Sequence, residues 1–198
     1  MPRDLRRAQV LRVAQELFTA EGFHHVSMDD IAERAEVSKP VLYRHFPSKL
    51  DLYLTVVDAL GADLLSAVDA AIAEVPDARN AITGVVASYL QFVDRTGEAA
   101  ALLFESDVMH DPDVRARVER ATDLVTGRLE QVLAGVPGLA PSPVAVLAPC
   151  LAAMAQQAAT RRLRDPHAPD ARQTAALVTR LAWGGVRDFL PDPDAGPA

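Results

Sequence analysis

A short run near the N-terminus gathers side chains that could bind a nucleic acid. Its polar and cationic members are Lys39, Tyr43, Arg44, His45 and Lys49. Lys and Arg pair with phosphates, Arg also reads guanine edges, and Tyr and His donate to phosphate oxygens. Pro40 and Val41 add small apolar surface of the kind that meets thymine methyl groups. The run could therefore present one face to the major groove of DNA.

Two short helices joined by a tight turn are expected to position this face. Ser27 with Asp30 three residues later is typical of a capping box, which predicts a helix that begins at residue 28. Ser38 is expected to cap the next helix, which tolerates Pro40 in its first turn. Pro47 then ends this second helix. The two helices make residues 27–46 a predicted helix-turn-helix.

The rotation of the second helix decides which side chains face outward. At about 100° per residue, Leu42 and Phe46 lie on one side as an inward pair. Pro40, Tyr43 and Arg44 then point outward, with Lys39 and Val41 on the flanks. Periodicity alone does not separate a DNA-binding pair of helices from an ordinary helical hairpin with a solvated face.

Charge is distributed unevenly along the 198 residues. The net charge of −7 argues against indiscriminate binding of nucleic acid by the whole chain. Residues 1–50, however, carry eight Lys or Arg against seven Asp or Glu, whereas the remainder carries 12 against 20. Both lysines of the chain lie in the first segment. The two segments are therefore interpreted separately.

Composition predicts an ordinary globular protein of the cytoplasm. No apolar run approaches the ~20 residues that a membrane helix needs, and the first residues do not resemble a secretory signal. The single cysteine, Cys150, excludes an internal disulfide and a cysteine-based metal site. A reducing compartment fits this usage best.

Helical periodicity extends over the rest of the chain, and strand alternation is nowhere convincing. Val10, Val13, Ala14, Leu17 and Phe18 mark one face of a first helix, which Gly22 is expected to stop. Proline, glycine and aspartate punctuation separates six longer predicted segments. These are residues 48–75, 79–96, 98–109, 112–134, 143–164 and 170–189. Pro149 is expected to kink or interrupt the fifth of them.

The run from Ile31 to Lys49 resembles the DNA-binding segment of the TetR family of bacterial transcriptional regulators. The similarity is continuous over residues 10–53, and its most specific part is Leu42-Tyr43-x-His45-Phe46-x-x-Lys49. The resemblance implies an all-α protein with an N-terminal three-helix helix-turn-helix domain, residues 1–50. A larger helical ligand-binding and dimerisation domain, residues 51–190, follows, and residues 191–198 are expected to be a disordered tail.

The resemblance also implies roles for single residues. The residues that match Lys39, Pro40, Val41, Tyr43 and Arg44 lie on the recognition-helix surface in that family, and those that match Lys39 and Val41 are often nearest the bases. The matches to Tyr43, His45 and Lys49 usually hold phosphates. Ser27 and Met28 match a helix start whose amides commonly meet a phosphate. Arg3, Arg6 and Arg7 match a basic leader that in some members reaches an adjacent groove.

Two positions depart from the family pattern. Glu36 lies in the turn where glycine is usual, because φ there is often positive, and a non-glycine residue costs on the order of 1 kcal/mol. Pro40 replaces a commoner small residue and removes one backbone N–H at the start of the recognition helix.

The last predicted helix suggests a dimer. Its apolar surface is wider than one stripe, and Gly184 and Gly185 lie inside it, where each glycine costs ~1 kcal/mol relative to alanine. A second helix packed closely over the glycines would explain them, although packing within the chain or an early helix end would do so too. The expected dimer contacts are Ala176, Leu177, Leu181, Trp183 and Gly184.

The ligand site is much less determined. Aromatic and Met residues at helical spacing are more often core than ligand contacts, but family pockets lie among the middle helices, and a mostly apolar cavity is the general form of such a site. The candidates are Tyr89, Phe92, Phe104, Met109, Cys150, Met154 and Gln157.

Other clusters receive structural explanations. Asp111 as the N-cap of a helix with Pro112 at its first position explains the run from His110 to Asp113 better than a metal site does. Cys150, inside an apolar run, is expected to be a buried inert thiol, and His24 and His25 to close a helix end. No catalytic residue, metal site or cofactor is predicted.

The sequence thus favours a non-enzymatic, ligand-responsive DNA-binding regulator. The expected form is a repressor that binds a near-palindromic operator as a homodimer and is released by a small, largely apolar effector. The alternative is a helical small-molecule carrier or an enzyme whose N-terminal hairpin is structural.

Overall fold

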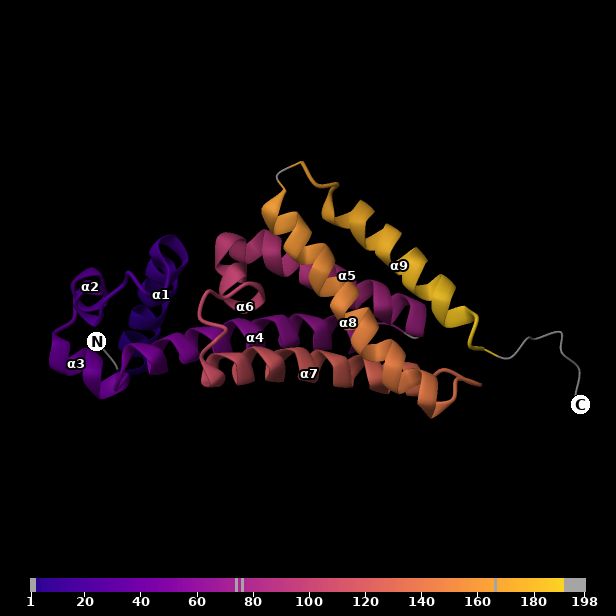
Figure 1. The fold of residues 1–198 in the computed structure, drawn as a ribbon, viewed down its shortest axis with the longest axis horizontal. Coiled ribbons are helices and arrows are strands. Elements are labelled where there is room, and N and C mark those ends of the chain that lie inside the picture. The colour runs from indigo at the N-terminus through magenta and orange to yellow at the C-terminus, as the bar shows by residue number, and fades with distance from the viewer. Residues whose placement is uncertain (1–2, 74, 76, 166, 191–198) are drawn as a thin grey trace, which may run out of the picture. The chain divides into compact units, whose positions relative to one another are not determined.

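The chain is all-α, as predicted. A computed structural model describes residues 3–73, 75, 77–165 and 167–190, in which the regular elements are all helices (Figure 1). Their bounds are α1 Arg3–Glu21, α2 Met28–Arg34, α3 Lys39–His45, α4 Lys49–Ala73, α5 Ala78–Thr96, the 3-10 helix η1 Gly97–Ala100, α6 Ala101–Phe104, α7 Pro112–Ala134, α8 Pro141–Arg164 and α9 Ala171–Arg187. The predicted tail, residues 191–198, lies outside the described residues.

Most helix ends agree with the sequence within two residues, which is the ordinary uncertainty of such bounds. Ser48 caps α4, because its hydroxyl accepts from the Asp51 N–H at 3.0 Å. Asp111 caps α7, with its carboxylate accepting from the N–H groups of Asp113 and Val114. His25 lies at the end of α1 with its Nδ1 3.0 Å from the Glu21 carbonyl oxygen, so the predicted helix closure is confirmed for this histidine.

The predicted helix over residues 98–109 is wrong. The chain there forms η1 and the single-turn helix α6, which ends at Phe104. Ser106 explains the stop, because its hydroxyl accepts from the Val108 N–H at 3.1 Å and also bonds the buried Tyr53 hydroxyl at 2.8 Å. A serine that binds nearby backbone in this way competes with the helical hydrogen-bond pattern.

Pro149 does not interrupt its helix. Helix α8 continues from Pro141 to Arg164, and Pro149 and Ala145 are both exposed on it. The carbonyl of Ala145 loses its helical donor at Pro149, but water can reach it. The prolines at the start of α8 are tolerated because the first N–H groups of a helix have no helical partner.

Contacts divide the chain into two compact units. The first comprises residues 1–62 and 98–120, and the second comprises residues 63–97 and 121–198. The predicted domains, 1–50 and 51–190, divide the chain by function instead, and this division stays a prediction.

The first unit packs α1, α2 and α3 around one apolar core. Val10, Ala14 and Phe18 line the inner side of α1 and are fully buried, as are Ile31 of α2 and Leu42 of α3. The Tyr53 ring, at the start of α4, meets Phe18 and Phe23 edge-on at 5.2 and 5.1 Å between centroids. Edge-to-face aromatic pairs of this kind add to the stabilisation from burial.

The second unit is built on α5, which packs against both α8 and α9 (Figure 1). Ile82, Val86 and Tyr89 on α5 are buried, and Gly84 lies so close to Ala71 of α4 that a Cβ there would approach the alanine methyl at 3.1 Å. Arg162 of α8 holds Asp94 of α5 through two of its guanidinium nitrogens, the shorter contact being 2.5 Å.

One helix in the described part of the chain, α8, is long and apolar enough to cross a membrane by length and composition. A single helix of this kind is weak evidence, since core helices of other proteins meet the same criterion. Only 39% of its apolar window is buried within the chain. Much of the apolar surface of α8 is therefore exposed in the single chain.

Candidate nucleic-acid interface

The turn between α2 and α3 has the geometry that the sequence predicts. Glu36 has a φ of 52°, in the region where glycine is favoured. The Glu36 N–H donates to the Glu33 carbonyl and the Val37 N–H to the Ala32 carbonyl, both at 3.0 Å. These two bonds are the Schellman pattern, which places a left-handed residue directly after the helix. The turn thus ends α2 and directs the chain into α3.

The predicted capping box at the start of α2 is also present. The Ser27 hydroxyl accepts from the Asp30 N–H at 3.1 Å, and the Asp30 carboxylate accepts from the Ser27 N–H at 2.8 Å. The Ser27 hydroxyl also donates to the Asp30 carboxylate at 2.7 Å, and this bond, together with the one from the Ser27 N–H, favours the ionised form and lowers the pKa of Asp30. Met28 is buried, so only its backbone could reach DNA.

Helix α3 presents the face that the rotation predicts. Leu42 and Phe46 are 0% and 2% exposed, whereas Tyr43 is 47% exposed. The remaining exposed side chains of α3 are Lys39, Pro40 and Arg44, and Val41 is half-buried. Tyr43 and Arg44 are therefore exposed, with Lys39 exposed on the flank, on a helix that is anchored by its buried side.

Ser38 precedes α3 as predicted, but its side chain makes no cap hydrogen bond. Pro40 occupies the second position of the helix and lacks the N–H that a cap would bind. The Ser38 carbonyl accepts instead from the Val41 and Leu42 N–H groups at 2.9 and 3.0 Å.

The cations of this region have different surroundings. The Lys39 ammonium lies 2.7 Å from the Asp29 carboxylate of α2, and this contact raises the pKa of Lys39. The Lys49 ammonium donates to the Phe23 and Val26 carbonyls at 2.7 and 2.8 Å and lies over the Phe23 ring. Arg44 is exposed.

The predicted DNA contacts His45, Arg6 and Arg7 are less free to reach DNA than the side chains of α3 described above. His45 is half-buried and its Nε2 atom is buried. A phosphate would therefore have to contact the other edge of the ring, or the His45 side chain would have to move first. Arg6 and Arg7 belong to α1 and not to an extended leader. The Arg7 guanidinium lies 5.0 Å from the centre of the Phe46 ring.

Several anchoring residues were not singled out from the sequence. Gln9 of α1 donates to the Ala35 carbonyl at 3.0 Å and so fixes the turn. Tyr53 connects the start of α4 with Phe23, between α1 and α2, and with Ser106, between α6 and α7. Their types carry no specific signal, because a polar side chain that bonds a distant backbone group is recognisable only when the chain has folded.

The predicted ligand residues are divided between the two compact units. Tyr89 and Phe92 are buried on α5, and burial raises the pKa of Tyr89. Phe104 and Met109 belong to the other compact unit. Met154 is half-buried, whereas Cys150 and Gln157 are exposed on α8. The expectation that Cys150 is buried is wrong, because the apolar run around it continues onto an outward face.

The predicted dimer residues lie mostly on an exposed face of α9. Ala176 and Gly184 are exposed, and Leu177 and Leu181 are 49% and 71% exposed. Trp183 differs, because it is half-buried and lines a hollow within its own chain, together with Asp77 and Val132. Among the described residues, a Cβ at Gly184 or Gly185 would meet nothing within 4 Å, so packing against these residues does not require either glycine.

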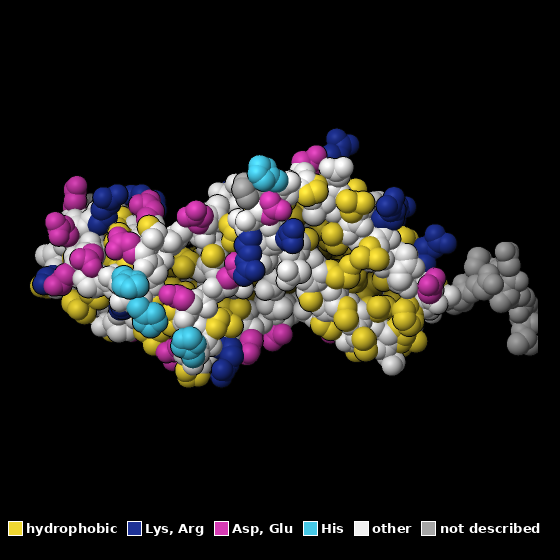
Figure 2. All heavy atoms as spheres, turned by 45° about the horizontal axis from the view of Figure 1, so that its top comes forward, with side chains coloured by type: hydrophobic (Ala, Val, Ile, Leu, Met, Phe, Trp, Pro, Cys, Tyr) yellow, Lys and Arg dark blue, Asp and Glu magenta, His cyan; other side chains and the backbone are white. Residues whose placement is uncertain are grey.

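The exposed face of α9 has a counterpart on α8. Val146 is 62% exposed, and Cys150, Ala153 and Gln157 follow it at the spacing of one helix face. Figure 2 shows hydrophobic side chains gathered over this part of the molecule. We call the outward residues of α8 and α9 the α8–α9 face.

The helical fold and the exposed surface of α3 define a helix-turn-helix DNA-binding protein with a helical second part. The family model for "Bacterial regulatory proteins, tetR family" matches residues 10–56. The chain is 35% identical over 186 residues to the HTH-type transcriptional activator FasR of Mycolicibacterium smegmatis, covering 94% of this chain and 85% of that protein. The chain belongs to the TetR family and is a DNA-binding transcriptional regulator.

Further comparisons agree with this assignment. The HTH-type transcriptional regulator TcmR of Streptomyces glaucescens is 32% identical, over 69% of this chain and 63% of that protein. A TetR-like regulator from Rhodococcus sp. RHA1 superposes with a TM-score of 0.77 at 26% identity, covering 94% and 98% of the two chains. FadR of Bacillus subtilis, solved in complex with stearoyl-CoA, shares the fold with a TM-score of 0.78 at 16% identity, covering 90% and 98%.

Proposed function

We propose that the protein is a ligand-responsive regulator that binds a near-palindromic operator as a homodimer, one α3 helix in each half-site. The carrying observation is the outward group of Lys39, Tyr43 and Arg44 on a helix fixed by the buried pair Leu42 and Phe46. A cation, a phenol and a guanidinium on one rigid face suit both base edges and phosphates.

The contacts divide into three kinds in this proposal. Lys39 and Val41 face the bases, with Pro40 and Arg44 beside them in the groove. Tyr43, His45 and Lys49 hold phosphates, and the backbone of Ser27 and Met28 meets one more at the start of α2. The Lys49 ammonium already donates to two carbonyls and so fixes the loop before α2, and its third N–H is proposed to hold the phosphate.

The homodimer is proposed to form through the α8–α9 face. Leu177 and Leu181 are large apolar side chains exposed to solvent, and a monomer gains by burying them. Gly184 leaves room for the close approach of a partner helix. The same burial would cover the exposed apolar part of α8, which favours a partner subunit over a membrane. We place the protein in the cytoplasm, where its DNA is.

The regulatory step is proposed to be release of DNA by a small, largely apolar effector, and the protein is proposed to be a repressor. An effector shifts this equilibrium only by binding the non-operator form more tightly than the operator form. The relative FasR is called an activator. The operator's place relative to the promoter decides the sign for this chain, and a reporter assay with and without the regulator gene measures it.

Fluorescence anisotropy with the DNA upstream of the regulator's own gene tests the DNA-binding proposal. We expect tight binding that exceeds binding to scrambled DNA and falls by ~10³ or more from low to moderate salt if the dimer makes 6–10 phosphate contacts. Tyr43→Ala should lose the specific binding, and Leu124→Ala, on an exposed leucine of α7, should keep it.

A different result would overturn the proposal. If the upstream DNA does not bind, selection from random DNA follows, since the operator could be distant. Weak, sequence-blind binding in both experiments would contradict a helix-turn-helix regulator. It would favour the alternative of a helical carrier or enzyme with a structural hairpin.

A further inference from the structure

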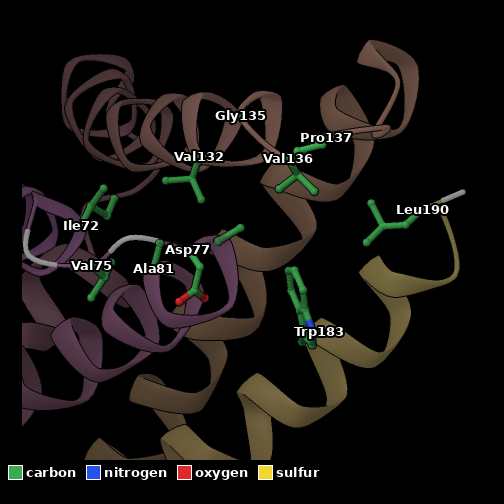
Figure 3. A pocket seen from close by; sticks show the side chains of 11 residues that line it. Ile72, Val75, Asp77, Ala81, Val132, Gly135, Val136, Pro137, Trp183 and Leu190 are labelled. Atoms are coloured by element: carbon green, nitrogen blue, oxygen red, sulfur yellow. The ribbon is translucent and has the colours of Figure 1, made fainter. Parts of the chain in front are cut away.

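A hollow of about 490 Å³ opens in the second unit where several helix ends meet (Figure 3). The end of α4, the start of α5, the end of α7 with the following loop, and the C-terminal part of α9 all contribute to it. Its volume is within the range of small-molecule sites. Its walls are mainly aliphatic, supplied by residues such as Ile72, Val132 and Val136.

Two polar groups break the apolar lining. Asp77 stands at the start of α5, and Trp183 lies on α9; both line the hollow (Figure 3). The indole N–H is a donor only, and no bond to it is formed by the residues that the structure describes. The Asp77 carboxylate accepts from the Asn80 N–H and side-chain amide at 2.9 and 2.7 Å. Each of its oxygens keeps the capacity for another hydrogen bond.

The charge of the lining selects the ligand. The described residues of the wall include no Lys, Arg or His, and Asp77 is its one carboxylate. A ligand carboxylate or phosphate would therefore be repelled by Asp77, and the described lining offers no cation to offset this repulsion. A hydroxyl or amide group can donate to Asp77 or accept from Trp183.

We propose that this hollow binds an uncharged apolar molecule that carries a hydroxyl or amide group, and that it excludes carboxylates and phosphates of the same apolar size. The aliphatic walls provide the affinity, and Asp77 and Trp183 determine which polar group of a ligand is accepted. That this ligand is also the effector rests on the function proposed above; its binding to the hollow does not.

Trp183 gives the site its own reporter, because it is the single tryptophan of the chain. The full protein is titrated with octan-1-ol and, separately, with octanoate, and tryptophan emission is recorded. Octan-1-ol should shift the emission to shorter wavelength in a saturable way as it displaces water from the indole. Octanoate should bind at least about tenfold more weakly, because it lacks a donor and repels Asp77.

Substitutions separate the charge of Asp77 from its role as a helix cap. Asp77→Asn keeps a good N-cap and removes the charge, so the discrimination against octanoate should shrink. Asp170→Asn is the matched control, since Asp170 caps α9 in the same way, through the Gln173 N–H, and does not line the hollow. Val132→Phe should fill the hollow and weaken octan-1-ol binding.

The outcomes distinguish this inference from the proposed function. Equal binding of octanoate and octan-1-ol, no saturable emission shift, or unchanged selectivity in Asp77→Asn would each overturn the inference. Operator binding is measured by anisotropy in the same titrations. If octan-1-ol binds at Trp183 and operator binding does not change, the site stands and its effector role fails. Release of the operator with a silent Trp183 would instead place the effector elsewhere and overturn the site.

Discussion

At the scale of single residues, Lys39 is arranged unfavourably for DNA binding and Glu36 unfavourably for folding. Lys39 is paired with Asp29 before any phosphate arrives. Glu36 occupies a left-handed position that favours glycine. Each of these conflicts can be removed by one substitution.

Asp29→Asn is expected to tighten operator binding. Both side chains of the Lys39–Asp29 pair are 60% exposed, so the pair is weak, and freeing Lys39 should raise the affinity only about two- to fivefold. Anisotropy titrations at low salt measure the change. Glu33→Gln, another exposed carboxylate of α2, controls for the general loss of negative charge. No gain over Glu33→Gln, or the same gain in a Lys39→Gln background, would contradict the pairing argument.

Glu36→Gly is expected to stabilise the protein. A non-glycine residue in this left-handed conformation costs on the order of 1 kcal/mol. Glycine removes this cost, but it also increases the conformational entropy of the unfolded chain, which offsets part of the gain. The net gain in the free energy of unfolding should be about 0.5–1 kcal/mol. Urea unfolding measures it, with Glu36→Ala as the control that keeps the strain. Equal midpoints for the two variants would count against the strain.

At the scale of elements, the start of α4 is the segment that ties the helix-turn-helix together. Tyr53 packs edge-on against Phe18 and Phe23 and bonds Ser106. Burial raises the pKa of the Tyr53 phenol, outweighing the hydrogen bond from Ser106. The tyrosine therefore has to stay protonated for this arrangement to persist.

Tyr53→Phe is expected to lower the free energy of unfolding by about 1 kcal/mol at neutral pH, because a buried hydrogen bond is lost. Because the folded pKa is raised, the stability from the neutral phenol is complete below pH about 10 and is lost as pH rises through the folded pKa. Urea midpoints between neutral and alkaline pH should fall less in Tyr53→Phe than in the natural protein. Tyr43→Phe, at an exposed side chain, should leave the alkaline loss unchanged; a parallel fall in all three proteins would refute the assignment.

At the scale of the whole molecule, the unexplained feature of the single chain is the exposed apolar α8–α9 face. Leu181 is the most exposed of the large hydrophobic residues that the structure describes. Patches of this kind mark interaction sites in other proteins. A partner subunit at this face would also fix the spacing of two recognition helices, which an operator requires.

Leu181→Glu is expected to produce a monomer that binds the operator at least about a hundredfold more weakly, because the second half-site loses its effective concentration. Light scattering coupled to size exclusion measures the mass, and anisotropy measures the binding. Leu124→Glu adds the same charge at a leucine of α7 that is 43% exposed and should remain dimeric. A dimeric Leu181→Glu protein would place the interface elsewhere.

Local rules were sufficient for much of the fold and of the candidate interface. The capping box at Ser27, the positive φ at Glu36 and the inward pair of Leu42 and Phe46 depend on neighbours within four residues, which the sequence displays directly. The prediction of a helix over residues 98–109 was wrong because Ser106 forms a hydrogen bond with Tyr53, which is 53 residues away in the sequence. A contact of that separation leaves no periodic signal.

The all-α class, most helix bounds, the outward face of α3 and the resemblance to TetR regulators follow from the amino-acid sequence, because periodicity, caps and motif residues are local properties. The pairing of Lys39, the exposure of Cys150 and the hollow lined by Trp183 and Asp77 follow from the packing of the helices. Such outcomes depend on which helix lies against which, and amphipathic helices can pack in several ways that satisfy the same pattern.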